Sequence, residues 1–238
     1  MVRNVSRNSS KTLFYVGCAC VGAYVAYRYW KKRQLKTIDE GFEEVSKIDD
    51  TNERRVLLLG LEGAGKTSLM NQAIASNVEG NSYVVPPAPT HGFAVYRLVN
   101  GPYTFSVWEI GGADDTRQYW SNFLQDTDLL LFMVDATSDS HKLSLAVSTL
   151  KQLLGDPRMD NVPILVIANK QDAPNALRPE EVKEALDLLS ISPHKHKVEV
   201  IACQTRPLPH FPPGTKEYTW HHPSVAIVEK KIFAMATS

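Results

Sequence analysis

GLEGAGKT, at residues Gly60–Thr67, fits the pattern G-x-x-x-x-G-K-[ST] at every fixed position. The apolar run 55–59 before it predicts a short buried strand, and 67–75 after it predicts a helix. Glycines let consecutive backbone N–H groups converge on phosphate oxygens, and the helix N-terminus adds its positive dipole end. A glycine-containing strand-to-helix turn without a ligand is the alternative. We expect a nucleotide-binding loop made of Gly60, Leu61, Glu62, Gly63, Ala64, Gly65, Lys66, Thr67 and Ser68, with Lys66 on the β- and γ-phosphates and Thr67 on Mg²⁺.

A second motif indicates which base is bound. The apolar run 163–168 predicts a core strand, and it is followed by Asn169, Lys170, Gln171 and Asp172. A carboxylate at Asp172 can accept two hydrogen bonds from guanine, whereas adenine offers no such pair of donors. The segment 198–205 is predicted as the last strand and would place Cys203 and Gln204 beside the base, although a buried strand end explains the same residues. The predicted base contacts are Asn169, Lys170, Asp172, Cys203 and Gln204.

Two further segments complete a resemblance. Together with the two motifs above, Pro89-Thr90-His91-Gly92-Phe93 and Trp108-Glu109-Ile110-Gly111-Gly112 resemble the ADP-ribosylation-factor-like (Arf-like) branch of small GTPases over residues 53–205. The resemblance implies that Thr90 completes the Mg²⁺ shell only when GTP is bound. It also implies that Gly112 donates its N–H to the γ-phosphate, with Glu109 and Gly111 in the same loop, so that loss of this phosphate releases both segments.

The chain departs from the family pattern at two positions. Glu109 stands where the family has Asp, and the longer side chain still brings a carboxylate toward Mg²⁺. Ala113 stands where the family has the Gln that orients the attacking water, and a methyl group forms no hydrogen bond. We therefore assign no catalytic side chain and expect weak intrinsic hydrolysis, which an arginine supplied by a partner could restore.

The order of predicted elements defines the fold class. Strands alternate with helices, which predicts an α/β P-loop NTPase with a doubly wound, mostly parallel six-stranded sheet. Asn100-Gly101 predicts a tight turn, and hence one antiparallel edge hairpin. The remaining predicted elements are strands at 93–99, 103–110 and 128–134 and helices at 141–154, 179–189 and 224–236.

Charge is distributed unevenly along the chain. Formal net charge is zero, yet residues 1–36 hold eight Lys or Arg and no acid, which leaves the remainder acidic. An acidic main domain argues against a general nucleic-acid-binding role. The uncharged run 13–27 and Trp30, with basic flanks, predict a transmembrane signal anchor at 13–30, preceding the sheet domain. A cleaved signal peptide and an interfacial or targeting helix are the alternatives.

The anchor makes predictions about location. More basic residues follow the anchor than precede it, which places the GTPase domain in the cytosol, on the mitochondrial outer membrane or the endoplasmic reticulum. Val2 excludes N-myristoylation. The four-residue spacing of Cys18, Gly22 and Ala26 could form a homodimer face, and Cys18 or Cys20 could be palmitoylated. With only Cys203 elsewhere, no disulfide framework or zinc site is expected.

The predicted domains are a basic flank at 1–12, the anchor at 13–30, a basic and then amphipathic linker helix at 31–52, and a GTP-binding domain at 53–238. That domain contains a proline-rich insertion at 206–223, which is a partner-binding loop or a solvated excursion.

The sequence thus predicts a membrane-anchored switch of Arf-like type that binds GTP or GDP with Mg²⁺ and acts through protein effectors, exchange factors and activating factors. The rival is a membrane tether that holds GTP and hardly cycles. A P-loop kinase or ATPase is disfavoured by the guanine motif.

Overall fold

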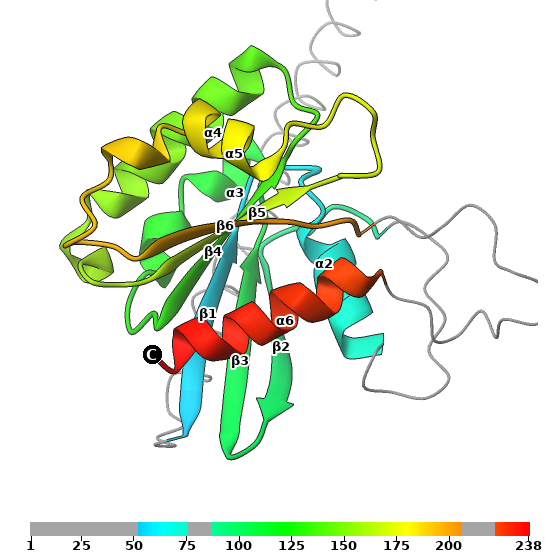
Figure 1. Ribbon diagram of the computed structural model, residues 1–238. Helices are drawn as coiled ribbons and strands as arrows, with labels where there is room; N and C mark the ends of the chain where they lie inside the picture. The colour runs from blue at the N-terminus through cyan, green and yellow to red at the C-terminus, as the bar shows by residue number, and fades with distance from the viewer. Residues whose placement is uncertain (1–51, 76–86, 206–221) are drawn as a thin grey trace, which may run out of the picture. The chain divides into compact units, whose positions relative to one another are not determined.

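The computed structural model describes residues 52–75, 87–205 and 222–238 (Figure 1). The chain divides into units 1–49 and 50–238, and all described residues lie in the second unit. The predicted flank and anchor, the linker except for Asn52, and most of the insertion therefore lie outside the described residues. Within the described ranges, no helix has the length and apolar character needed to cross a membrane.

One six-stranded sheet organises the domain, in the order β2-β3-β1-β4-β5-β6. β2 pairs with β3 antiparallel, and every other neighbouring pair is parallel. Both the mostly parallel sheet and its antiparallel edge hairpin are confirmed. The strands are β1 (Glu53–Leu59), β2 (Phe93–Asn100), β3 (Tyr103–Ile110), β4 (Leu129–Asp135), β5 (Ile164–Asn169) and β6 (Val198–Ala202).

Helices cover both faces of the sheet, as a parallel sheet requires. Figure 1 shows α2 (Lys66–Ala75) beside α6 (Pro223–Ala236) on one face, with α3 (Asp114–Arg117), α4 (Ser140–Leu154) and α5 (Pro179–Ala185) on the other. The core between the sheet and the pair α2 and α6 is aliphatic, with contributions that include Leu58, Met70, Leu131, Val228 and Ile232. The 3₁₀ turns are η1 (Trp120–Phe123), η2 (Pro157–Met159) and η3 (Leu188–Ser190).

Three predicted boundaries were wrong. The helix predicted to run to 189 ends at Ala185, because Asp187 adopts a left-handed backbone (φ 51°) and the chain turns into η3. The last strand ends at Ala202 instead of 205, and beyond it the Gln204 N–H donates to the Ser224 hydroxyl of α6 instead of to a neighbouring strand. Pro223 is the first residue of α6 instead of the last of the insertion, because its fixed φ suits a helix N-terminus.

Candidate functional site

The topology brings the predicted segments to one edge of the sheet. Gly60 follows β1, Gly111 follows β3, Asn169 ends β5 and Cys203 follows β6. These four strands are parallel, so their carboxyl ends meet at the same edge. Residues separated by more than a hundred positions in the sequence therefore line one site.

The lysine of the phosphate loop is hydrogen-bonded to backbone oxygens of the same loop. Lys66 Nζ donates to the carbonyl oxygens of Gly60 at 2.8 Å and Leu61 at 3.2 Å. The side chain is only 6% exposed. Burial lowers the pKa of Lys66 to about 8, although the nearby carboxylates of Glu109 and Glu62 oppose the shift. An ammonium held this way is poorly solvated and needs an anion, which phosphate oxygens would supply.

One glycine of this loop is required by close packing. Gly60 has φ 152°, and a Cβ added there would lie 2.3 Å from the carbonyl oxygen of Met133 on β4. Only glycine lets the backbone turn at this point without a clash. The phosphate loop borders a cavity of about 310 Å³, whose lining includes Lys66, Thr67 and Thr90.

Three oxygen atoms from residues that line this cavity lie close together. Thr67 Oγ1 lies 3.0 Å from Thr90 Oγ1, and the two hydroxyls donate to Glu109 Oε1 at 2.5 and 3.0 Å. Hydroxyl and carboxylate oxygens are the ligands that Mg²⁺ prefers, and neighbouring ligands around the ion stand about 2.9 Å apart in octahedral geometry. The donor set therefore fits Mg²⁺, with Thr67 and Thr90 placed to hold it and Glu109 beside them.

A tyrosine that the sequence analysis missed orients this carboxylate. Tyr96 on β2 donates its hydroxyl to Glu109 Oε2 at 3.0 Å. The hairpin register pairs Ala94 with Glu109, and Tyr96 stands two residues further along the same face of β2. The register of the predicted hairpin could therefore have indicated the contact between Tyr96 and Glu109.

The segments 89–93 and 108–112, termed the first and second switch segments, meet at the phosphate loop. A Cβ at Gly112 would lie 2.4 Å from the Gly60 oxygen and 2.5 Å from the Glu62 nitrogen. A Cβ at Gly111 would lie 2.4 Å from the Thr90 oxygen. The doubled glycine is therefore needed for close approach between the two switch segments and the loop.

Ala113 lines the same cavity and precedes α3. Its methyl group offers no hydrogen bond. Asp114 is 89% exposed and pairs with Arg117 at 2.7 Å. Asp115 is exposed and accepts a hydrogen bond from Thr116. Neither aspartate lines the cavity, so neither replaces a missing glutamine there.

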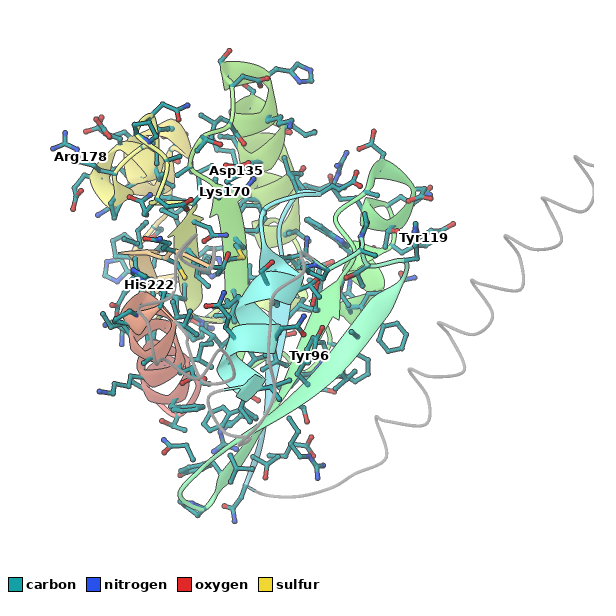
Figure 2. The ribbon with its side chains drawn as sticks, turned by 90° about the vertical axis from the view of Figure 1, so that its right-hand side faces the viewer. Tyr96, Tyr119, Asp135, Lys170, Arg178 and His222 are labelled. Atoms are coloured by element: carbon teal, nitrogen blue, oxygen red, sulfur yellow. The ribbon has the colours of Figure 1, made fainter. Side chains whose placement is uncertain are left out.

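The base motif is tied to the phosphate loop through its first residue. The fully buried Asn169 donates from Nδ2 to the Ala64 oxygen at 2.7 Å and to Thr205 Oγ1 at 3.0 Å. Lys170 has φ 64° and pairs with Asp135 at 2.7 Å, and Figure 2 shows the two side chains next to each other. Burial alone would raise the pKa of Asp135, but hydrogen bonds from Lys170 and Thr137 outweigh it and lower this pKa.

Cys203 and Gln204 follow β6, and the Cys203 carbonyl oxygen accepts a hydrogen bond from the Gln171 N–H of the guanine motif at 3.2 Å. Cys203 is fully buried, which raises the pKa of its thiol to about 11, and its backbone pairs with Ala168 and Gln171. The Gln204 amide donates to Ser224 Oγ of α6 at 2.9 Å. No sequence pattern pointed to Ser224, because its contact with Gln204 joins segments on either side of the insertion.

A phosphate loop, a switch threonine and a guanine motif at one edge of such a sheet define a P-loop small GTPase. The model of the ADP-ribosylation factor family matches residues 42–210. This chain belongs to the ADP-ribosylation factor family, and its Arf-like character is confirmed by its relatives.

Two relatives and one solved structure illustrate the likeness. The chain is 35% identical over 154 residues to ADP-ribosylation factor-like protein 3 of Chlamydomonas reinhardtii, covering 65% of this chain and 82% of the relative. It is 33% identical over 183 residues to ADP-ribosylation factor-like protein 2 of Drosophila melanogaster, covering 77% and 91%. The Arl6 BBS3 small GTPase of Trypanosoma brucei, solved with the nucleotide analogue GppNp, shares the fold with a TM-score of 0.61 at 23% identity, covering 78% of this chain and 98% of that one.

Proposed function

We propose that this Arf-like switch is anchored in a membrane, binds Mg²⁺ with GTP or GDP, hydrolyses GTP slowly on its own, and recruits protein effectors in its GTP state. Asp172 would select guanine, and Lys66 with Thr67 and Thr90 would hold the phosphates and the ion. The observation that carries the proposal is Ala113 in the lining of the phosphate cavity.

Slow hydrolysis follows from the chemistry at that position. Attack on the γ-phosphate requires a water molecule in line with the bond that breaks, and a side-chain amide usually holds it there. The Ala113 methyl group forms no hydrogen bond to water, and neither Asp114 nor Asp115 lines the cavity. A group supplied by a partner would then decide when the GTP state ends.

An aromatic cluster supports the recruitment of effectors. Phe93 opens β2, three residues after Thr90, and is half-buried. Its ring stacks on Trp108 at 5.4 Å and lies 5.7 Å from Phe123, both of which are buried. Movement of Thr90 with the nucleotide state would displace Phe93 and change the apolar surface offered beside it. Such a surface suits an apolar protein partner.

Anchoring is proposed from the sequence, namely from the uncharged run 13–27 and its basic flanks. A spanning helix does not leave the membrane when nucleotide changes, so the switch would act by recruiting partners to a fixed place. The mitochondrial outer membrane and the endoplasmic reticulum are the two proposed locations.

The test is the nucleotide that the protein carries. The full chain is purified in mild detergent with Mg²⁺, and the nucleotide released on denaturation is separated by chromatography. Slow hydrolysis predicts mostly GTP. Single-turnover hydrolysis by Ala113→Gln should then be about 10- to 100-fold faster than by wild type, whereas Ala113→Met, which matches the length of Gln without its amide, should stay slow. Mostly GDP in wild type, with Ala113→Gln unchanged, would show that Ala113 does not limit the reaction.

The same residue favours a second candidate, a membrane tether that holds GTP and hardly cycles. Exchange measurements separate the two. A switch releases its nucleotide within minutes or in response to an exchange factor, whereas a tether keeps GTP for many hours and binds the same partners throughout.

A further inference from the structure

Guanine presents three polar groups along the edge that Asp172 would read: the exocyclic amino group, N1–H and the carbonyl O6. A carboxylate can accept from the first two, but O6 needs a separate N–H donor. Cys203 cannot supply one, because its N–H donates to the Ala168 oxygen at 2.9 Å and its oxygen accepts from Gln171 at 3.2 Å. The Gln204 amide is the first backbone donor beyond this pairing, at the carboxyl end of β6.

In the structure, this donor already has an acceptor. The Gln204 N–H donates to Ser224 Oγ at 2.9 Å. Ser224 is the second residue of α6, on the far side of the insertion from Gln204. One amide hydrogen makes one strong, linear hydrogen bond, so guanine O6 and the Ser224 hydroxyl are alternative acceptors for it.

The Ser224 hydroxyl is held firmly in this position. It lies 2.8 Å from His222 Nδ1 and 3.7 Å from Cys203 Sγ. His222 caps α6, where Figure 2 shows it at the start of the helix, and its backbone N–H donates to Gln72 Oε1 at 3.5 Å. Gln72 belongs to α2, is 2% exposed, and also donates to the Thr205 oxygen. The residues on both sides of the insertion are thus fastened to the helix that carries the phosphate-binding lysine.

We propose that the Ser224 hydroxyl competes with guanine O6 for the Gln204 amide and thereby sets how tightly and for how long the protein holds its nucleotide. This inference rests on the proposed function, because it requires guanine beside Asp172. A weakened hold on the base speeds release of GDP without a partner. Combined with slow hydrolysis, it makes the GTP-bound fraction follow the cellular ratio of GTP to GDP.

The test compares Ser224→Ala and Ser224→Cys with wild type in the full chain, in detergent and Mg²⁺. The readouts are the dissociation rate of a fluorescently labelled GDP and the equilibrium Kd for unlabelled GDP. Removing a competing acceptor should slow release and tighten binding by about fivefold to tenfold, the value of one neutral hydrogen bond. Ser224→Cys keeps the shape of the side chain but is a weak acceptor, so it should change both quantities in the same direction. All samples contain a reductant, because the Ser224 oxygen lies 3.7 Å from Cys203 Sγ.

A modified base links the effect to O6. In 6-thio-GDP, a sulfur that accepts hydrogen bonds weakly replaces O6, so Ser224→Ala should tighten its binding by less than about twofold. Ser148→Ala on α4 serves as the control, because the Ser148 hydroxyl donates at 3.0 Å to the Leu145 carbonyl oxygen of its own helix. It should change neither quantity.

The outcomes are distinct. Unchanged or faster GDP release in both Ser224 variants overturns the inference, and so does equal tightening of GDP and 6-thio-GDP. If Ser224→Ala fails to fold, Ser224→Cys still decides. If the wild-type chain binds no guanine nucleotide at all, the proposed function itself fails, and that result is separable from the behaviour of Ser224.

Discussion

Binding of GDP should draw a proton from solvent at alkaline pH, because of Lys66. Burial lowers the pKa of this lysine to about 8 from its usual 10.5. Phosphate oxygens beside it would favour the charged form and raise the pKa again. At pH 9 the free protein would then have about a tenth of its Lys66 charged, so binding should take up about 0.9 proton; at pH 7 the uptake should be about 0.1.

The sign of the pH dependence follows from this difference. The bound state holds more protons than the free state above pH 8, so affinity for GDP should fall as pH rises through about 8, by roughly tenfold per pH unit up to the pKa of the bound lysine. At pH 9 the Cys203 thiol, with its pKa raised to about 11, stays protonated and adds nothing to the proton uptake.

The assay is calorimetric titration of GDP with Mg²⁺ into protein stripped of nucleotide, in two buffers with different ionisation enthalpies. The difference in observed enthalpy gives the number of protons taken up. Lys66→Arg provides a control, since a guanidinium remains charged at pH 9 and should take up almost none. An uptake below about 0.3 proton for wild type at pH 9, or equal uptake by Lys66→Arg, would refute the reasoning.

Three other perturbations follow from the site. Gly60→Ala should lower the free energy of unfolding in urea by about 3 kcal/mol or more, because the added Cβ meets a backbone carbonyl of β4. Gly63→Ala has no atom within 4 Å of the added Cβ and should cost about 1 kcal/mol for its positive φ alone. Equal losses in the two variants would contradict the steric argument. Tyr96→Phe should weaken the Mg²⁺ dependence of nucleotide binding about threefold to tenfold, since Glu109 loses its orienting hydrogen bond; an unchanged Mg²⁺ titration would argue against that role. Asp172→Asn should lower GDP affinity about 100-fold or more and improve binding of xanthosine diphosphate, both measured by competition; retained guanine preference would mean that other groups read the base.

The sheet could be predicted from the sequence because its signals are local. Strands β4 and β5 are unbroken apolar runs, and Asn100-Gly101 fixes the hairpin turn. The end of α5 was missed for the opposite reason. Asp187 leaves the helix with a left-handed backbone, and its carboxylate accepts a hydrogen bond from Lys151 of α4 at 2.5 Å. The sequence of residues 179–189 holds no pattern that predicts this contact between Asp187 and Lys151, which lies 36 positions away.

In the site, too, local motifs could be recognised in the sequence, whereas contacts between distant segments could not. Motifs located the residues that would touch phosphate, Mg²⁺ and guanine, since their spacing is set by backbone geometry within one loop. The residues that hold them in place, such as Tyr96, Asp135 and Ser224, come from other elements and became visible only through strand register and helix packing. The predictions about the membrane anchor, the linker and the homodimer concern residues outside the described ranges and stay predictions.

The position of Asn169 has a consequence for how this protein could be re-engineered or could diverge. Its amide spans the distance between the phosphate loop at Ala64 and Thr205 in the segment after β6, and it is buried from solvent. Asp172, three residues later, would meet only the base. A substitution at Asp172 can therefore change which purine is preferred while Asn169 stays constant. A lineage that evolves to bind another nucleotide would keep its asparagine long after it had lost its aspartate.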